Sequence, residues 1–109
     1  MKRHHPKIAD ARDLLRKHDL HPKRSFSQNF LIQPHAVAKI ADAAASLGKH
    51  VVELGPGLGA LTAALLARDC QVLAIELDRD MVRVLEEELG AEPDLEIRQG
   101  DAADLEVAA

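Results

Sequence analysis

The sequence contains few aromatic residues and a single cysteine. Two of the 109 residues are phenylalanine, and tryptophan and tyrosine are absent. Cys70 cannot form an internal disulfide, and its apolar surroundings (RDCQVLAI) indicate packing rather than nucleophilic chemistry. No run of about 18 apolar residues occurs, and the N-terminus MKRHHPKIADARD lacks the apolar stretch of a secretory signal. We therefore expect a cytoplasmic protein without a membrane partner, with enough hydrophobic residues (47%) for one globular unit.

Positive charge is concentrated at the N-terminus. Residues 1–24 hold eight of the 14 Lys and Arg residues and three acidic ones, which gives this segment a net charge of +5. Because the whole chain has a net charge of −4, residues 25–109 carry −9. A basic arm on an acidic body favours contact with a polyanion such as RNA, because Lys and Arg displace counterions from phosphates. Composition is equally compatible with a solvated terminus that binds nothing.

Two helices are expected before the glycine-rich region. Apolar residues at helical spacing between residues 8 and 18 predict a short amphipathic helix, which Pro22 prevents from continuing. A second helix is expected to begin at Pro34, since proline suits the first turn of a helix, and to end at Gly48. Between them NFLIQP is expected to form a loop.

After residue 49 the pattern alternates between short β-rich runs and helical segments. The expected strands are 50–54, 71–75 and 95–98, and the expected helices are 59–68 and 79–89. Asp78 is the expected N-cap of the last helix, and Gly90 lies beyond its end. This order predicts an α/β fold with a parallel sheet and right-handed crossovers.

The segment VVELGPGLGALTAALL (51–66) joins the first strand to the next helix. Its glycines allow positive φ and close backbone approach, and the helix N-terminus offers N–H groups, so the turn suits the sugar or charged end of a cofactor. Glu76 follows Gly55 by 21 residues and ends the second strand, where a carboxylate accepts hydrogen bonds from both ribose hydroxyls. The competing interpretation is a tight turn with a solvated Glu76.

Two cofactor classes fit this turn. The pattern G-x-G-x-x-A at 55–60 satisfies the dinucleotide fingerprint and predicts a nicotinamide-dependent oxidoreductase. The pattern E-x-G-x-G-x-G at 53–59 is common in sites for S-adenosylmethionine, which has no pyrophosphate. Pro56 favours S-adenosylmethionine, because proline lacks an N–H that a pyrophosphate would use.

Four segments, in this order and spacing, resemble the rRNA adenine dimethyltransferases, which include ribosome-assembly methylases and erythromycin-resistance methylases. They are DLLRKHDLHPKRSFSQNFL, VVELGPGLGALTAALL, VLAIELDRDM and IRQGDA. The resemblance covers the whole chain, and its leader and GPGLGALT are closer to the small-subunit, ribosome-assembly branch. It implies the first three strands of a Rossmann-like, S-adenosylmethionine-dependent methyltransferase fold, with a basic extension (1–24) before the N-terminal half of the cofactor domain (25–109).

The resemblance also implies residues that contact the cofactor. Asn29 and Leu31 match positions that touch the methionine part of S-adenosylmethionine, and Gly55 and Gly57 would approach its amino-acid end. The adenosine part would meet four further residues, with Glu76 on the ribose, Leu77 against the adenine ring, Asp101 on the adenine amino group and the Ala102 N–H on a ring nitrogen.

Ribosomal RNA, within a precursor of the small ribosomal subunit, is the partner that the resemblance implies. Lys17, Lys23 and Arg24 would approach this RNA. Phe26 and Phe30 are interpreted as core residues rather than as base-stacking groups.

The family's Asn-Leu-Pro-Tyr-like motif, which accepts hydrogen bonds from the amine of a flipped-out adenine, does not occur in the sequence. The resemblance therefore implies no catalytic residue in this chain, which we expect to be inactive alone. In the strand order 3-2-1-4-5 the first strand would be left as an exposed edge, for which we expect a homodimer. The alternatives are a fragment of a nicotinamide-dependent oxidoreductase and a non-catalytic RNA-binding module.

Overall fold

Helices and parallel strands alternate along the chain in the computed structural model, which describes residues 11–20, 34–101 and 103. The elements are α1 (Ala11–Lys17), α3 (Pro34–Leu47), β1 (His50–Leu54), α4 (Ala60–Ala67), β2 (Gln71–Glu76), α5 (Arg79–Leu89) and β3 (Leu95–Gln99). Every strand and helix predicted between residues 34 and 99 is confirmed, with ends that differ by one residue or none.

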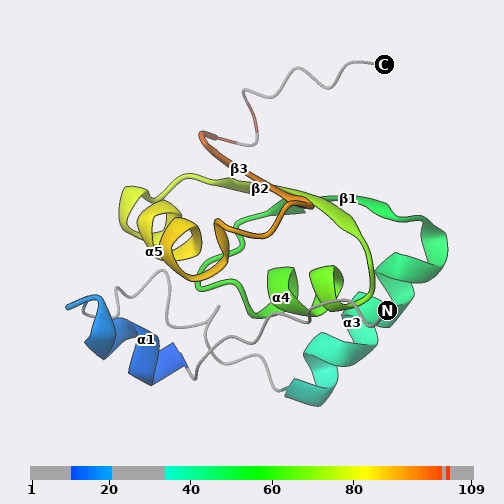
Figure 1. The fold of residues 1–109 in the computed structure, drawn as a ribbon, viewed down its shortest axis with the longest axis horizontal. Helices are drawn as coiled ribbons and strands as arrows, with labels where there is room; N and C mark the ends of the chain where they lie inside the picture. The colour runs from blue at the N-terminus through cyan, green and yellow to red at the C-terminus, as the bar shows by residue number, and fades with distance from the viewer. Residues whose placement is uncertain (1–10, 21–33, 102, 104–109) are drawn as a thin grey trace.

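The strands form one parallel sheet in the order β1-β2-β3 (Figure 1). The register pairs Val52 with Leu73, and Leu73 with Glu96. Within the described residues β1 therefore lies at one edge of the sheet, as the sequence predicts. Parallel strands need a crossover, and α4 and α5 supply the two crossovers here.

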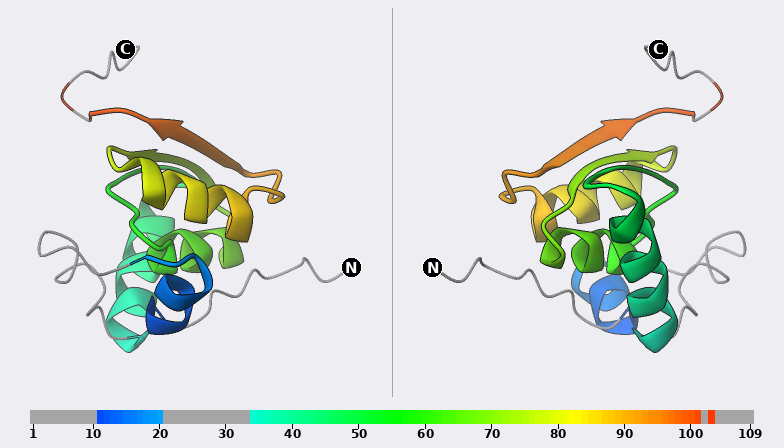
Figure 2. Two further views of the ribbon diagram at one scale, coloured as in Figure 1. Left: turned by 90° about the vertical axis from the view of Figure 1, so that its left-hand side faces the viewer. Right: turned by 90° about the vertical axis from the view of Figure 1, so that its right-hand side faces the viewer.

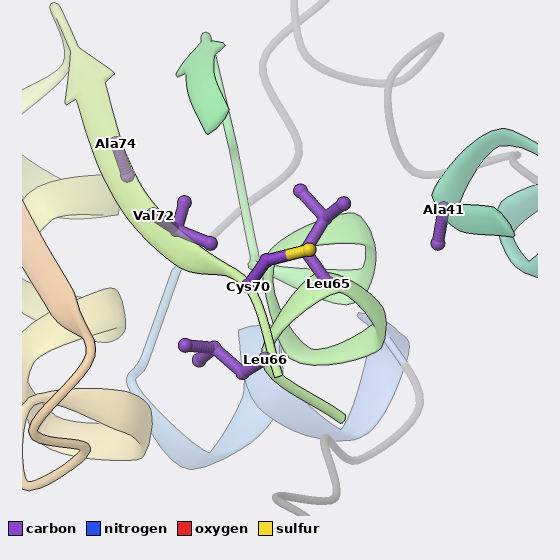
Figure 3. Packing of buried hydrophobic residues seen from close by; sticks show 6 residues of the cluster. All are labelled: Ala41, Leu65, Leu66, Cys70, Val72 and Ala74. Carbon is purple, nitrogen blue, oxygen red and sulfur yellow. The ribbon is translucent and has the colours of Figure 1, made fainter. Parts of the chain in front are cut away.

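The core lies between the sheet and the helices α3 and α4. Because successive side chains of a strand point to opposite faces, Val72 and Ala74 both face the helices and are buried. They pack with residues of α3 and α4 and with the residue that precedes β2 (Figure 3), namely Ala41, Leu65, Leu66 and Cys70. Cys70 is fully buried, which confirms its predicted packing role.

Helix α5 packs against β2 and β3 through an apolar stripe. The buried members of the stripe recur at helical spacing and are Met81, Val82, Val84, Leu85 and Leu89. The Asp78 carboxylate accepts a hydrogen bond from the Met81 N–H at 3.0 Å, which confirms the predicted N-cap. At the other end the Gly90 N–H donates to the Glu86 carbonyl at 2.9 Å.

Helix α1 lies beyond α4 and α5, on the side away from the sheet (Figures 1 and 2). Its buried side chains, Leu14 and Leu15, form a cluster with Leu58 of the glycine-rich turn and with Met81 and Val84 of α5. The described part of the basic extension is thus packed against the α/β body.

All the described helices lie on one side of the sheet, and none of them covers its other face (Figure 2). On that face β1 exposes two apolar side chains, Val52 at 59% and Leu54 at 58%. Such exposure is unusual in a parallel sheet, which is normally covered on both faces. Among the described residues, no helix has the length and apolar character needed to cross a membrane.

Candidate functional site

The glycine-rich turn lies at the carboxyl end of β1 and adopts the backbone conformation that glycine favours. The φ angles are +66° at Gly55, +58° at Gly57 and +89° at Gly59, which confirms the predicted positive φ. The Gly55 N–H donates to the Ile75 carbonyl at 2.9 Å and so holds the turn against β2. A Cβ at Gly55 would meet no atom within 4 Å, so this part of the backbone borders open space.

Glu76 ends β2 directly beside this turn. Its Oε1 accepts a hydrogen bond from the Gly57 N–H at 3.0 Å, and its Oε2 accepts one from the Asp78 N–H at 2.9 Å. The residue is only 6% exposed, which excludes the interpretation as a solvated strand end. Each carboxylate oxygen has two lone pairs, so Glu76 retains acceptor sites after these two bonds.

A second buried carboxylate, Glu53, lies on β1 next to the turn. The hydroxyl of Thr62, which is fully buried on α4, donates to Glu53 Oε1 at 2.5 Å. The pKa of Glu53 is raised to about 7, mainly by burial and also by the negative charge of Glu76, while the hydrogen bond from Thr62 lowers it. Thr62 is not predicted from the sequence, where its one signal is a hydroxyl in the otherwise apolar helix ALTAALLA.

Two further predicted cofactor residues lie beyond the ends of β2 and β3. Leu77 follows Glu76 and is 67% exposed. The Gly100 N–H donates to the Glu76 carbonyl at 3.0 Å, which holds the start of the Asp101 turn at the end of β2. Asp101 is exposed, and its carboxylate accepts a hydrogen bond from the Ala103 N–H at 2.9 Å.

The predicted RNA-contacting residues are only partly described. Lys17 lies on α1, where its Nζ is 2.6 Å from Glu88 Oε2 of α5. Its side chain remains 64% exposed. The structure does not describe the other two, Lys23 and Arg24. Three of the predicted cofactor residues also lie outside the described residues, namely Asn29, Leu31 and Ala102.

A hollow of about 490 Å³ lies elsewhere, among the first residues of the three strands, where its lining includes His50, Gln71 and Leu95. The glycine-rich turn is at the opposite ends of the strands. We base the candidate site on the turn, because parallel α/β sheets bind ligands beyond the carboxyl ends of their strands. A glycine-rich turn after the first strand and an acidic residue at the end of the second define the class of Rossmann-like α/β proteins.

Comparison with known proteins identifies the family within this class. Residues 20–109 match the family model described as ribosomal RNA adenine dimethylase. The chain belongs to this family. Membership confirms the family resemblance found in the sequence and decides against the nicotinamide-dependent alternative.

Curated relatives named ribosomal RNA small subunit methyltransferase A resemble the chain over most of its length. The protein of Pelotomaculum thermopropionicum is 44% identical over 99 residues, covering 90% of this chain and 34% of the relative. The protein of Anaeromyxobacter dehalogenans strain 2CP-C is 50% identical over 99 residues, with the same two coverages of 90% and 34%. The chain therefore spans about a third of the length of these relatives.

Solved structures share the fold. A candidate RNA methyltransferase from Pyrococcus horikoshii superposes with a TM-score of 0.68 at 26% identity, over 89% of this chain and 55% of that protein. A coclaurine N-methyltransferase bound to N-methylheliamine and SAH gives a TM-score of 0.55 at 26% identity, over 69% of this chain and 24% of that one. The fold of the chain is that of these methyltransferases, as the sequence predicts.

Proposed function

We propose that this chain forms the cofactor-binding part of an S-adenosylmethionine-dependent rRNA adenine N6,N6-dimethyltransferase that acts on the small ribosomal subunit in the cytoplasm. The observation that carries the proposal is the contact between Gly57 and Glu76, which places a carboxylate with spare acceptor sites beside an open glycine turn. The family match and the names of the relatives support the reaction and the RNA substrate.

The charge of the site fits S-adenosylmethionine better than a dinucleotide. Glu53 and Glu76 are both buried beside the turn and interact electrostatically. S-adenosylmethionine carries a sulfonium, an ammonium and a carboxylate group and is positive overall, whereas a dinucleotide would bring a doubly negative pyrophosphate towards two acidic side chains. Opposite charge stabilises a bound ligand in such a site, and like charge opposes it.

The proposed roles of the residues follow from their places around the turn. Glu76 would accept hydrogen bonds from the ribose hydroxyls, Leu77 would cover the adenine ring, and Asp101 would accept from the adenine amino group. The turn at Gly55 and Gly57 would allow the amino-acid end of the cofactor to approach the backbone. When bound, S-adenosylmethionine would supply an activated methyl group.

Residues outside the described part would complete the site. Asn29 and Leu31 are proposed for the methionine part, and the Ala102 N–H for a ring nitrogen of adenine. We assign no catalytic residue within the 109 residues, and the chain alone is proposed to be inactive.

The basic extension is the proposed RNA-binding part, with residues 1–24 serving RNA and residues 25–109 serving the cofactor. Lys17, Lys23 and Arg24 would contact phosphates. Replacing any one of them by alanine should reduce the slope of log affinity against log salt by about 1, measured with a small-subunit rRNA fragment. An unchanged slope in all three variants would contradict this assignment.

Calorimetric titration of S-adenosylmethionine, with NAD as the competing ligand, tests the cofactor proposal. We expect S-adenosylmethionine to bind and the variant Glu76→Gln to weaken it about tenfold or more, since a charged hydrogen-bond acceptor is lost. The matched control is Glu96→Gln, an exposed carboxylate on β3, which should bind like the original chain.

A second variant guards against a folding defect, because Glu76 also holds backbone groups of the turn. Asp101→Asn changes an exposed side chain and should weaken binding while leaving the melting temperature unchanged. Binding of NAD instead, or of neither ligand, would contradict the proposal.

We also propose that the chain forms a homodimer through the exposed edge at β1. The support is the position of β1 at the edge of the described sheet and the exposure of Val52 and Leu54 on its uncovered face. Unpaired strand edges and exposed apolar patches are typical association surfaces. A stable monomer at micromolar concentration in sedimentation experiments would contradict the proposal.

A further inference from the structure

His18, one residue beyond the C-terminal end of α1, faces two carboxylates of α5 at once. Its Nδ1 is 3.0 Å from Glu87 Oε2, and its Nε2 is 3.0 Å from Glu88 Oε2. The imidazole side chain is only 4% exposed, although Glu87 remains 55% exposed. The contact joins positions about 70 residues apart in the sequence.

This arrangement suits only one protonation state of the ring. A neutral imidazole has one N–H and one nitrogen lone pair, and an ionised carboxylate has acceptors only. With a neutral ring, one of the two carboxylates would therefore face a lone pair at hydrogen-bonding distance. The doubly protonated ring donates to both carboxylates, and hydrogen bonds between charged groups are the strong ones.

Two cations also contact this cluster. Lys17 Nζ lies 2.6 Å from Glu88 Oε2, and Arg83 Nη2 of α5 donates to the His18 carbonyl at 3.4 Å. Hydrogen bonds from Lys17 and His18 hold the pKa of Glu88 below its ordinary value. Glu88 therefore stays ionised in mildly acidic solution and can accept a hydrogen bond from a protonated ring.

The cluster lies beside the apolar contact that docks α1. Leu14 and Leu15 of α1 pack against Leu58 of the glycine-rich turn and against Met81 and Val84 of α5. The helix itself is two turns long, which is too short to be stable without such packing. A change in the charged cluster should therefore alter the docking of the whole helix.

We propose that His18 is a positioning residue that latches the basic helix α1 onto α5 and the glycine-rich turn when its ring is protonated, and releases it when the ring is neutral. The latch is closed while both ring nitrogens carry a proton, and it loosens when the ring loses one of them, because a lone pair then faces a carboxylate. The inference stands on the contacts of α1 and does not depend on the proposed cofactor or RNA.

Hydrogen exchange of the backbone amides in the full chain tests the latch. Protection factors corrected for the intrinsic rate at each pH would be compared at about pH 5.5 and about pH 8. We expect α1 protection to fall about tenfold between them, as for the loss of one charged hydrogen bond, while β2 amides report any global change. His35→Gln is the matched control, an exposed histidine on α3 that should leave the result unchanged.

Two variants separate a latch from ordinary packing. His18→Gln should give low α1 protection at both pH values. Glu88→Gln should give high protection at both, because an amide can accept from the charged ring and donate to the neutral one. Protection of α1 that does not depend on pH in the original chain would overturn the proposal. The same pH dependence in His18→Gln would overturn it as well.

Ring-nitrogen spectra of the unaltered chain provide a test that needs no variant. At about pH 5.5 the spectra should show protons on both nitrogens of His18, since both face carboxylates. A neutral tautomer at this pH would overturn the proposal even if a variant failed to fold.

Discussion

Glu53 is a carboxylic acid whose burial determines its protonation state. Its pKa rises from 4.5 to about 7 because the side chain is buried and Glu76 is close. Between these two values the folded state binds a proton that the unfolded state releases, so the free energy of unfolding falls as the pH rises from about 4.5 to about 7. Over the full range the decrease is about 3 kcal/mol, and above pH 7 it levels off.

The variant Glu53→Gln should remove this decrease. The amide is uncharged at every pH and still accepts from Thr62, so the variant should be more stable than the original chain at about pH 8 and similar to it at about pH 4.5. Urea unfolding across this range measures the effect, with Glu86→Gln on the exposed face of α5 as the control. Equal pH profiles for Glu53→Gln and the original chain would mean that Glu53 is ionised throughout.

The variant Leu77→Ala tests the proposed adenine contact without affecting the core. Because its side chain is 67% exposed, Leu77→Ala should change the free energy of unfolding by less than about 0.5 kcal/mol. If the ring of adenine covers it, the variant should weaken S-adenosylmethionine binding about fivefold, as expected for partial loss of a buried leucine contact. Leu47→Ala, at the end of α3 and 91% exposed, is the control and should change neither quantity.

At the residue scale, sequence reasoning was sufficient where a residue type has a fixed geometric meaning. Glycines in the turn require positive φ, and an acidic residue at the end of the second strand must lie beside that turn, so Gly55 and Glu76 could both be placed. The bond from Thr62 to Glu53 could not be predicted, because it depends on how α4 is rotated over β1. A threonine hydroxyl on an apolar helix can equally well donate its hydrogen bond to a backbone carbonyl of the same helix.

At the element scale, α5 has a cap that is predictable from sequence and separable from its packing. Asp78→Ala removes the acceptor for the Met81 N–H and should cost about 1 kcal/mol, or about 5 °C in melting temperature. Thermal unfolding followed by circular dichroism measures the change. Asp78→Ser is the matched control, since serine also caps helices and should restore most of the loss. A similar melting temperature for all three proteins would show that the cap contributes little here.

Helix α1 shows what local pattern leaves open at the same scale. The apolar spacing predicts a helix at about the right place, and Leu14 and Leu15 on its buried face. The pattern cannot identify the partner of that face, because the contacts with Leu58 and with Glu88 join residues more than 40 positions apart. His18 is consistent with an apolar face in the sequence, and only the fold shows that it ends between two carboxylates.

At the scale of the whole molecule, the described helices cover the sheet on one side only. Alternation along β1 directs Val52 and Leu54 away from the described helices, and Leu73 of β2 lies beside Val52 on the same face. The sequence predicts that β1 is a strand, whose side chains alternate between the two faces of the sheet. It does not predict what covers the second face, because an apolar side chain can pack against a helix, a sheet or another copy of the chain.

The proposed homodimer could use either the edge of β1 or its uncovered face, and variants of Val52 distinguish the two. Lys49 accepts from Gln71 through its carbonyl, and Gly55 donates to Ile75. Since pairing groups alternate along a strand, the N–H of Val52 points to the open edge. Val52→Pro removes this edge donor, a change that edge strands tolerate, while Val52→Lys keeps the donor and makes the face charged.

Sedimentation of the two variants at equal concentration gives the answer. Dimerisation through the edge predicts that Val52→Pro is monomeric and that Val52→Lys remains a dimer, because lysine leaves the backbone groups of the edge available. Packing of two uncovered faces predicts that Val52→Lys is monomeric, since burying an unpaired charge costs more than the apolar contact contributes. Glu86→Lys, on the exposed side of α5 and away from both the edge of β1 and the uncovered face of the sheet, is the control for a general effect of charge. Dimers of unchanged stability for both Val52 variants would place the association surface elsewhere on the molecule and contradict the role proposed for β1.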